Sequence, residues 1–195
     1  NRSFEEIEAI LNQALKADAA VIMELTNQDP KLLEARQNIS LNISNPAGLT
    51  AYLSKRAEHD FPEIPEVTFE ICDVPASMEE HLSPAFYLVS AIDRWQKNVV
   101  YLNNGYLTED LSLFTTLAHE SYPGHLYQTV YESANTPHPI HRILYFGGYT
   151  EGWATYAEQL SYYYAPISED LATLLSTSRA MTLNLYSHLD LYIHA

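Results

Sequence analysis

The segment HESYPGH, residues 119–125, decides how the second half of this chain must fold. It is a variant of H-E-x-x-H, in which two histidines one helical turn apart bind zinc and the glutamate acts as general base. Here the second histidine comes two residues late. In a regular α-helix, positions i and i+6 are about 120° apart around the axis and about 9 Å apart along it. A straight helix therefore cannot direct His119 and His125 at one ion.

Pro123 and Gly124, which stand between the two histidines, change this expectation. Proline has no N–H to donate to the carbonyl of His119, and its ring crowds that turn of the helix. Glycine tolerates backbone angles that are closed to other residues. We predict that the helix breaks over residues 122–124 and that a second helix begins near Pro123, so that His125 swings back toward His119. The alternative is a helix-loop-helix joint that carries two ordinary histidines.

The segment EGWATYAE, residues 151–158, offers a third metal ligand. A catalytic zinc ion has three protein ligands and one water. We predict Glu151 as this ligand. Glu158 lies seven residues later on the same helical face, where it can orient or charge-balance a neighbouring ligand. The alternative is that both glutamates are solvated helix carboxylates, which is the usual place of this residue type.

The rest of the chain reads as helices around a small sheet. Apolar periodicity and capping residues predict helices over 4–25, 30–37, 45–58, 109–121, 123–132, 139–146, 149–164 and 168–194. Alternation between prolines predicts strands over 67–72, 85–91 and 98–103. We therefore expect one predominantly helical α+β domain, with an antiparallel sheet roughly over 66–103 and the catalytic helices over 109–195.

The strand before the catalytic helices has a predicted function of its own. An extended peptide can add to an exposed edge strand through backbone hydrogen bonds. Val99–Asn103 is the candidate edge, with Asn103 as a polar contact to the substrate. The alternative is a buried core strand.

These motifs together resemble a known bacterial family, the one called domain of unknown function 885. HESYPGH with Gln128, EGWATYAE, the Arg179-Ala180 pair and DLYIH at residues 190–194 are similar to its pattern over about the last 130 residues. The resemblance implies a mostly helical, zincin-like metallopeptidase fold. It also implies metal ligands at His119, His125 and Glu151 with Glu120 as the base, and export from the cytoplasm for many members.

Two departures from the family pattern stand near the C-terminus. Tyr192 occupies a position where the pattern has glycine, which affects the packing near His194. Family members also continue for a further helical stretch beyond the position of Ala195, so we expect this chain to be part of a longer protein.

The expected chemistry is amide hydrolysis by water bound to one zinc ion, with Glu120 moving the proton. A second donor to the oxyanion is needed, and His194, Tyr149 and Tyr156 are the candidates. Asp190 stands four residues before His194 and could fix its tautomer. The alternative for that pair is a surface ion pair worth a few tenths of a kcal/mol.

Arg179 on the last helix is a candidate for binding a substrate carboxylate, which would make the enzyme a carboxypeptidase. The alternative is a structural ion pair with Glu158 or another acid.

Composition limits the partners. The 195 residues carry a net charge of −15, so the chain should repel nucleic acid. No apolar run approaches the ~18 residues of a membrane span, and a single cysteine excludes an internal disulfide. Localisation and oligomeric state stay open.

The predicted function is a zinc-dependent peptidase that acts on a peptide substrate. Two alternatives remain: a non-catalytic module or inactive fragment that binds metal and peptide, and a metal-dependent hydrolase of non-peptide substrates.

Overall fold

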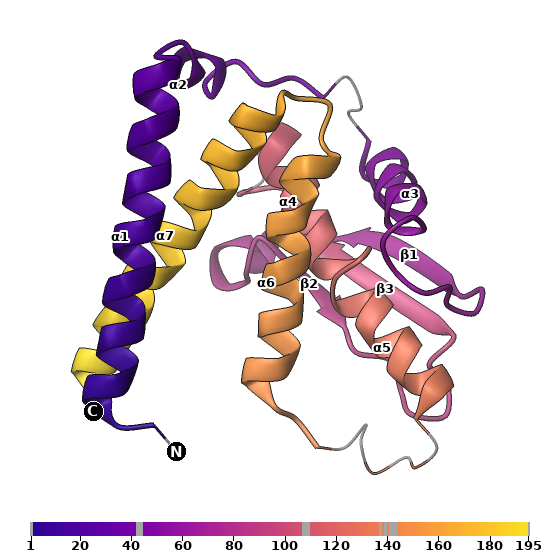
Figure 1. The fold of residues 1–195 in the computed structure, drawn as a ribbon. Helices are drawn as coiled ribbons and strands as arrows, with labels where there is room; N and C mark the ends of the chain where they lie inside the picture. Colours follow the sequence, from indigo (N-terminus) through magenta and orange to yellow (C-terminus); the bar gives the residue numbers. More distant parts are fainter. Residues whose placement is uncertain are drawn as a thin grey trace. The chain divides into compact units, whose positions relative to one another are not determined.

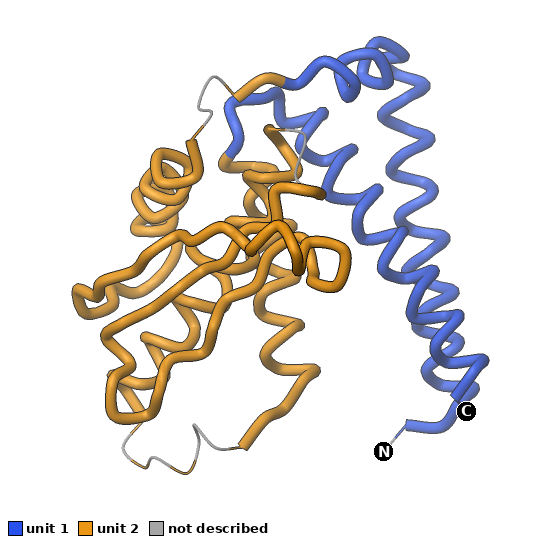
Figure 2. Tube along the Cα trace, turned by 180° about the vertical axis from the view of Figure 1, so that it is seen from behind, with its two compact units in different colours: residues 1–39, 165–195 blue, residues 40–164 orange. Residues whose placement is uncertain are grey.

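A computed structural model of the chain describes residues 2–41, 45–106, 110–136, 138, 140 and 144–194. They form two compact units, which Figure 2 colours separately: unit 1 is Asn1–Ile39 with Ala165–Ala195, and unit 2 is Ser40–Tyr164. These units are groups of closely packed residues and are not the same as domains. The single domain that the sequence predicts therefore stays a prediction.

Unit 1 consists of helices. Two long ones, α1 (Phe4–Gln28) and α7 (Glu169–His194), lie side by side in Figure 1, with the short α2 (Leu32–Ala35). Ser3 caps α1: its hydroxyl accepts from the N–H of Glu6, whose carboxylate accepts from the N–H of Ser3. Asn184 on α7 donates its amide to the carbonyl of Leu11 at 3.0 Å. This bond connects the two long helices.

Unit 2 contains a three-stranded mixed sheet, so the predicted antiparallel arrangement is wrong in part. The strands are β1 (Thr68–Asp73), β2 (Ala85–Leu88) and β3 (Lys97–Leu102), in the order β1-β3-β2. β3 pairs in parallel with β1 and antiparallel with β2. Between β1 and β2 the chain runs through a 3-10 helix, η1 (Ala76–His81), and leaves room for β3 between them.

The edge strand was predicted in the wrong place. β3 is the central strand, and Asn98, Val100 and Leu102 on one of its faces are buried. A strand with a buried face cannot leave its backbone N–H and C=O groups unpaired without a cost in free energy. In a central position both edges of the strand are hydrogen-bonded to neighbours, so these groups are paired. The alternative of a buried core strand is therefore correct for Val99–Asn103.

Asn103 has a structural position rather than the predicted contact with substrate. It is fully buried. Its amide group donates to the carbonyls of Glu79 and Leu82, at 2.8 and 3.1 Å, and its side-chain oxygen accepts from the N–H of Gly105. These bonds hold the end of β3 against η1 and leave the side chain no free donor.

Four helices complete unit 2: α3 (Pro46–Ala57), α4 (Asp110–Glu120), α5 (His125–Asn135) and α6 (Gly147–Tyr164). Helix α4 packs against α3, α6 and β2 (Figure 1). The largest fully buried apolar side chains of unit 2 come from α3, β3, α4 and α5: Leu49, Leu53, Val100, Leu102, Phe114, Leu117, Leu126 and Val130. Because its end lies inside this core, α4 provides a rigid support for His119.

Several boundaries differ from the prediction. The helix predicted over 139–146 falls largely outside the described residues, and 144–146 are not helical, since α6 begins at Gly147. α1 runs three residues further than predicted, β2 ends three residues earlier, and α5 begins at His125 rather than near Pro123.

Candidate metal centre

The helix break predicted over residues 122–124 is confirmed. Helix α4 ends at Glu120 and α5 begins at His125, with a cis peptide bond between Tyr122 and Pro123. The last helical bond of α4 runs from the N–H of Ser121 to Leu117 at 2.8 Å. The first of α5 runs from the N–H of Gln128 to Gly124 at 2.9 Å.

Glycine is the one residue type that fits at position 124 of this turn. A Cβ at position 124 would lie 1.8 Å from the carbonyl oxygen of His119 and 2.4 Å from that of Ala118. Both are backbone atoms, so neither can turn away as a side chain would. The turn is also tied to α6, because the indole N–H of Trp153 donates to the carbonyl of Pro123 at 2.7 Å. The start of α5 thus lies directly against the end of α4.

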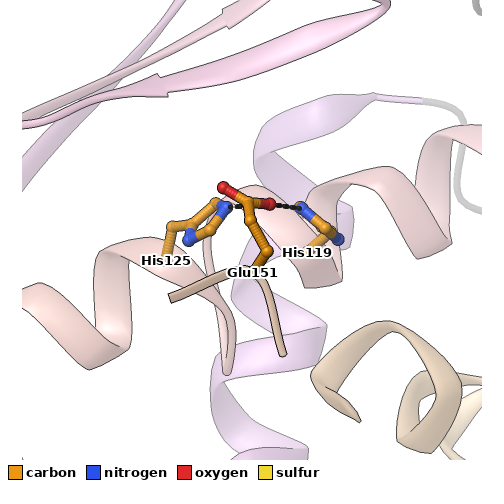
Figure 3. A group of neighbouring side chains, drawn as sticks. All are labelled: His119, His125 and Glu151. Carbon is orange, nitrogen blue, oxygen red and sulfur yellow. Dashed lines mark ion pairs between the residues drawn. The ribbon is translucent and has the colours of Figure 1, made fainter. Parts of the chain in front are cut away.

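This close approach brings the three predicted ligands together. His119 ends α4, His125 begins α5 and Glu151 stands near the start of α6. One ligand atom from each lies within 4.8 Å of the others. Figure 3 shows the Glu151 carboxylate between the two imidazoles. Its Oε2 lies 3.6 Å from Nε2 of each histidine.

The two distances from the Glu151 carboxylate to the histidines suit a tetrahedral ion. Zinc binds histidine nitrogen and carboxylate oxygen at about 2.0–2.2 Å, so two ligand atoms on one tetrahedral ion are roughly 3.4 Å apart. The observed 3.6 Å is close to this value. The side chain of Glu151 is 54% exposed, so the group faces solvent, where a water or substrate ligand can reach it.

Glu158 lies against the side of His119 that carries Nδ1. Its carboxylate is nearly buried and lies 3.3 Å from Nδ1 of His119. A carboxylate on Nδ1 fixes the ring orientation and leaves Nε2 to face Glu151 and His125. Glu158 thus lies beside His119, and its predicted role as an orienting acid stays a prediction.

Glu120 follows His119 in the chain and has an unusual environment. Burial raises the pKa of its carboxyl to about 7, and the charges of Glu151 and Glu158 add to this, while His119 and the N–H of Tyr87 act against it. That N–H donates to Oε2 of Glu120 at 2.7 Å. A carboxyl with a pKa near neutrality can both take and release a proton, as a general base and acid must.

The two histidines differ in their electrostatics. Burial lowers the pKa of His119, but its hydrogen bond to Glu158 and the charges of Glu120, Glu158 and Glu151 outweigh burial and raise it overall. Burial and the neighbouring His119 lower the pKa of His125. A divalent cation would favour the neutral imidazoles and the ionised carboxylate that ligation requires.

Comparison with known proteins agrees with the motifs. The family model described as "Bacterial protein of unknown function (DUF885)" matches residues 1–194. The chain belongs to this family. The crystal structure of a "putative lipoprotein" from Colwellia psychrerythraea has a similar fold, with 19% sequence identity and a TM-score of 0.69 over 97% of the DUF885 chain. The DUF885 chain spans 36% of that protein's length. No curated protein matches the chain.

Tyr149 and Tyr156, two candidate oxyanion donors, lie on α6 of the DUF885 chain, and both are exposed. The hydroxyl of Tyr149 lies beside Glu132, which raises its pKa. The ring of Tyr156 contacts Phe61 and Trp153. These described contacts do not include the three metal-binding candidates, so the catalytic role of either tyrosine stays a prediction.

His194, Asp190 and Arg179 lie on α7, in unit 1. Nδ1 of His194 lies 3.0 Å from the carboxylate of Asp190, with the side chains 70% and 76% exposed. This is the geometry of the surface i,i+4 pair that the sequence left open as an alternative. Arg179 is half-buried. The predicted roles of these residues concern a site in the other unit and stay predictions.

Sequence reasoning missed the contact between Tyr87 and Glu120. It joins a backbone N–H of β2 to a side chain 33 residues later. A backbone donor has no signature in the sequence, so the order of the strands would have been needed to find it.

Among the described residues, no helix combines the length and the apolar character needed to cross a bilayer.

Proposed function

We propose that this DUF885 chain carries the catalytic centre of a zinc-dependent peptidase. The observation behind the proposal is the convergence of His119, His125 and Glu151, whose ligand atoms lie within 4.8 Å of one another beside the motif glutamate. Two imidazoles and one carboxylate are a donor set of catalytic zinc sites. One ion held there would polarise the substrate carbonyl and lower the pKa of bound water.

Glu120 supplies the proton transfer in this proposal. Its carboxyl, which lies in a largely buried site beside His119, can accept the proton of the attacking water and later give it to the leaving nitrogen. Glu158 keeps His119 oriented, and Gly124 lets His125 reach the same ion.

The outer edge of β2, on the side away from β3, supports a peptide as the substrate. β2 pairs with β3 on one side, and the N–H of Tyr87 points away from β3 toward Glu120. Leu88 and Val89, which follow Tyr87, are exposed. An extended peptide that added a strand along this edge would place its backbone beside the general base. This edge replaces Val99–Asn103 as the candidate docking strand.

A second candidate function is metal and peptide binding without turnover by this chain. The observation that favours it is the coverage: the chain spans 36% of the related lipoprotein structure, so groups needed for catalysis can belong to other segments. Hydrolysis of a non-peptide amide or ester uses the same metal centre and is the third outcome to test.

Zinc content and turnover should be measured together on the wild-type chain and on Glu120→Gln. Zinc is quantified by mass spectrometry after dialysis, and turnover by digestion of a peptide library. We expect one zinc per chain in both proteins, with hydrolysis lost in the variant, because glutamine keeps the shape of Glu120 but accepts no proton.

Retained hydrolysis in Glu120→Gln would remove the proposed base. One zinc without hydrolysis in the wild-type chain would favour the binding module, and cleavage of esters alone would favour the third reading.

A further inference from the structure

A cavity of about 590 Å³ lies in unit 2, next to the turn of the motif. Its walls come from the end of α3, the segment that leads from α3 to β1, and the residues around the turn. Three aromatic rings line it: Phe61, Tyr122 and Tyr127. Binding pockets for small groups are typically several hundred Å³ with aromatic walls, so both size and lining suit a ligand.

Three glutamates give the cavity its charge. Glu58, Glu63 and Glu66 are among the residues that line it, and all three are exposed. No lysine, arginine or histidine is among the lining residues. Within the described chain, no ion pair or side-chain hydrogen bond engages these three carboxylates.

The basic residues of the adjoining helix do not neutralise this charge. Lys55 and Arg56 do not line the cavity, and the guanidinium of Arg56 lies 5.5 Å from the centre of the Tyr164 ring. The cavity therefore combines an apolar wall with a negative rim. The net charge of the whole chain, −15, has the same sign as this rim.

The cavity is continuous with the turn that positions the metal ligands. Tyr122, on its wall, stands three residues from His119 and three from His125. Tyr127, also on the wall, stacks on Trp153, whose indole N–H is bonded to Pro123. A group held in the cavity is therefore held against the residues that shape the site.

We propose that this cavity binds an arginine side chain of the peptide substrate. An arginine stem is apolar and its planar guanidinium stacks on aromatic rings, whereas its charge seeks carboxylates. Phe61, Tyr122 and Tyr127 receive the stem and the plane, and Glu58, Glu63 and Glu66 face the charge. That the arginine belongs to a peptide rests on the proposed function, but binding in the cavity requires no metal.

The test compares two peptides that differ only in charge: an alanine pentapeptide with a central arginine, and the same peptide with citrulline, the neutral analogue of similar shape. Their dissociation constants are measured by calorimetry on the whole chain in EDTA, where no metal-dependent turnover occurs. We expect the arginine peptide to bind about tenfold tighter, since three exposed carboxylates each contribute a fraction of a kcal/mol. The gap should narrow as salt is added.

The variant Glu58→Gln/Glu63→Gln/Glu66→Gln removes the three charges with little change in shape. We expect it to bind both peptides within about twofold of each other. The control, Glu34→Gln/Glu80→Gln/Glu169→Gln, makes the same change in net charge at exposed positions that do not line the cavity, and should keep the tenfold gap. Circular dichroism checks that both variants are folded, and Glu63→Gln alone should reduce the gap about twofold.

Equal binding of the two peptides by the wild-type chain would overturn the proposal. So would an unchanged gap in the cavity variant, or an equal loss in both triple variants, which would assign the preference to net charge. Hydrolysis with zinc but no arginine preference would overturn this pocket and leave the peptidase. Arginine-dependent binding without hydrolysis would leave the pocket and overturn the peptidase.

Discussion

Two histidine–carboxylate pairs in this chain have similar distances and opposite surroundings. His119 and Glu158 are 3.3 Å apart and largely buried. They lie on two different helices and are 39 residues apart in the sequence. His194 and Asp190 are 3.0 Å apart, on one turn of α7, with most of both side chains in water. The first pair needs the whole packing of unit 2 to form, whereas the second forms on any helix with that spacing. Proximity alone therefore does not indicate a functional pair; burial and the neighbouring groups do.

The largest effect on stability is expected at the turn between α4 and α5, which brings His125 close to His119 of the buried pair. Gly124→Ala places a methyl group 1.8 Å from a backbone oxygen, so α4 and α5 must separate. We predict a loss of at least about 3 kcal/mol in the free energy of unfolding, measured by urea denaturation, as for other severe core clashes. The matched control is Gly152→Ala within α6, where a Cβ meets nothing within 4 Å. It should leave stability unchanged or raise it by up to about 1 kcal/mol. Similar losses in both variants would contradict the close approach at Gly124.

Zinc affinity should separate the buried and the exposed histidines. His125→Ala removes one of three ligands, and we predict that the dissociation constant for zinc rises by more than about 100-fold. His194→Ala, with its exposed side chain, should leave it within about twofold. Titration against a competing chelator measures both. An equal effect of the two substitutions would show that burial does not distinguish these histidines.

Substitution of the carboxylate partners, Glu158 and Asp190, should also affect zinc affinity unequally, but by a smaller factor than substitution of the histidines. Glu158→Gln keeps a hydrogen-bond acceptor near Nδ1 of His119 but removes the charge. We predict zinc binding weaker by 10- to 100-fold, as for other outer-shell carboxylates. Asp190→Asn should not change zinc binding and should change the free energy of unfolding by less than about 0.5 kcal/mol. A stronger effect of Asp190→Asn on zinc would give the α7 pair the role that we assign to Glu158.

The smallest effect concerns the bond that ties the turn to α6. Trp153→Phe keeps an aromatic ring against Tyr127 but removes the N–H that donates to Pro123. We predict a loss of about 1–2 kcal/mol in stability, measured by thermal unfolding. Trp95→Phe makes the same change on the loop before β3 and should cost less. The reverse order would remove the Trp153 bond as a support of the turn.

The candidate site was predictable from sequence because its signals are local. A proline followed by a glycine between two histidines has a direct backbone consequence, and the spacing of Glu151 and Glu158 places both on one helical face. The family match over residues 1–194 and the mostly helical fold agree with those motifs.

The sheet was less predictable because its order is not local. Alternation in β3 shows that one face is buried, but it does not show whether one or two strands pair with it. For this reason Asn103 was expected at an edge and is found buried among backbone carbonyls. The contact from Tyr87 to Glu120 depends on that same strand order and was missed for the same reason.

The central claim is that His119, His125 and Glu151 bind one ion, and anomalous diffraction from zinc-soaked crystals tests it most directly. We predict a single strong peak about 2.0–2.2 Å from Nε2 of both histidines and from a carboxylate oxygen of Glu151. A zinc ion bound through other side chains, or no peak between these three residues at saturating zinc, would contradict the claim.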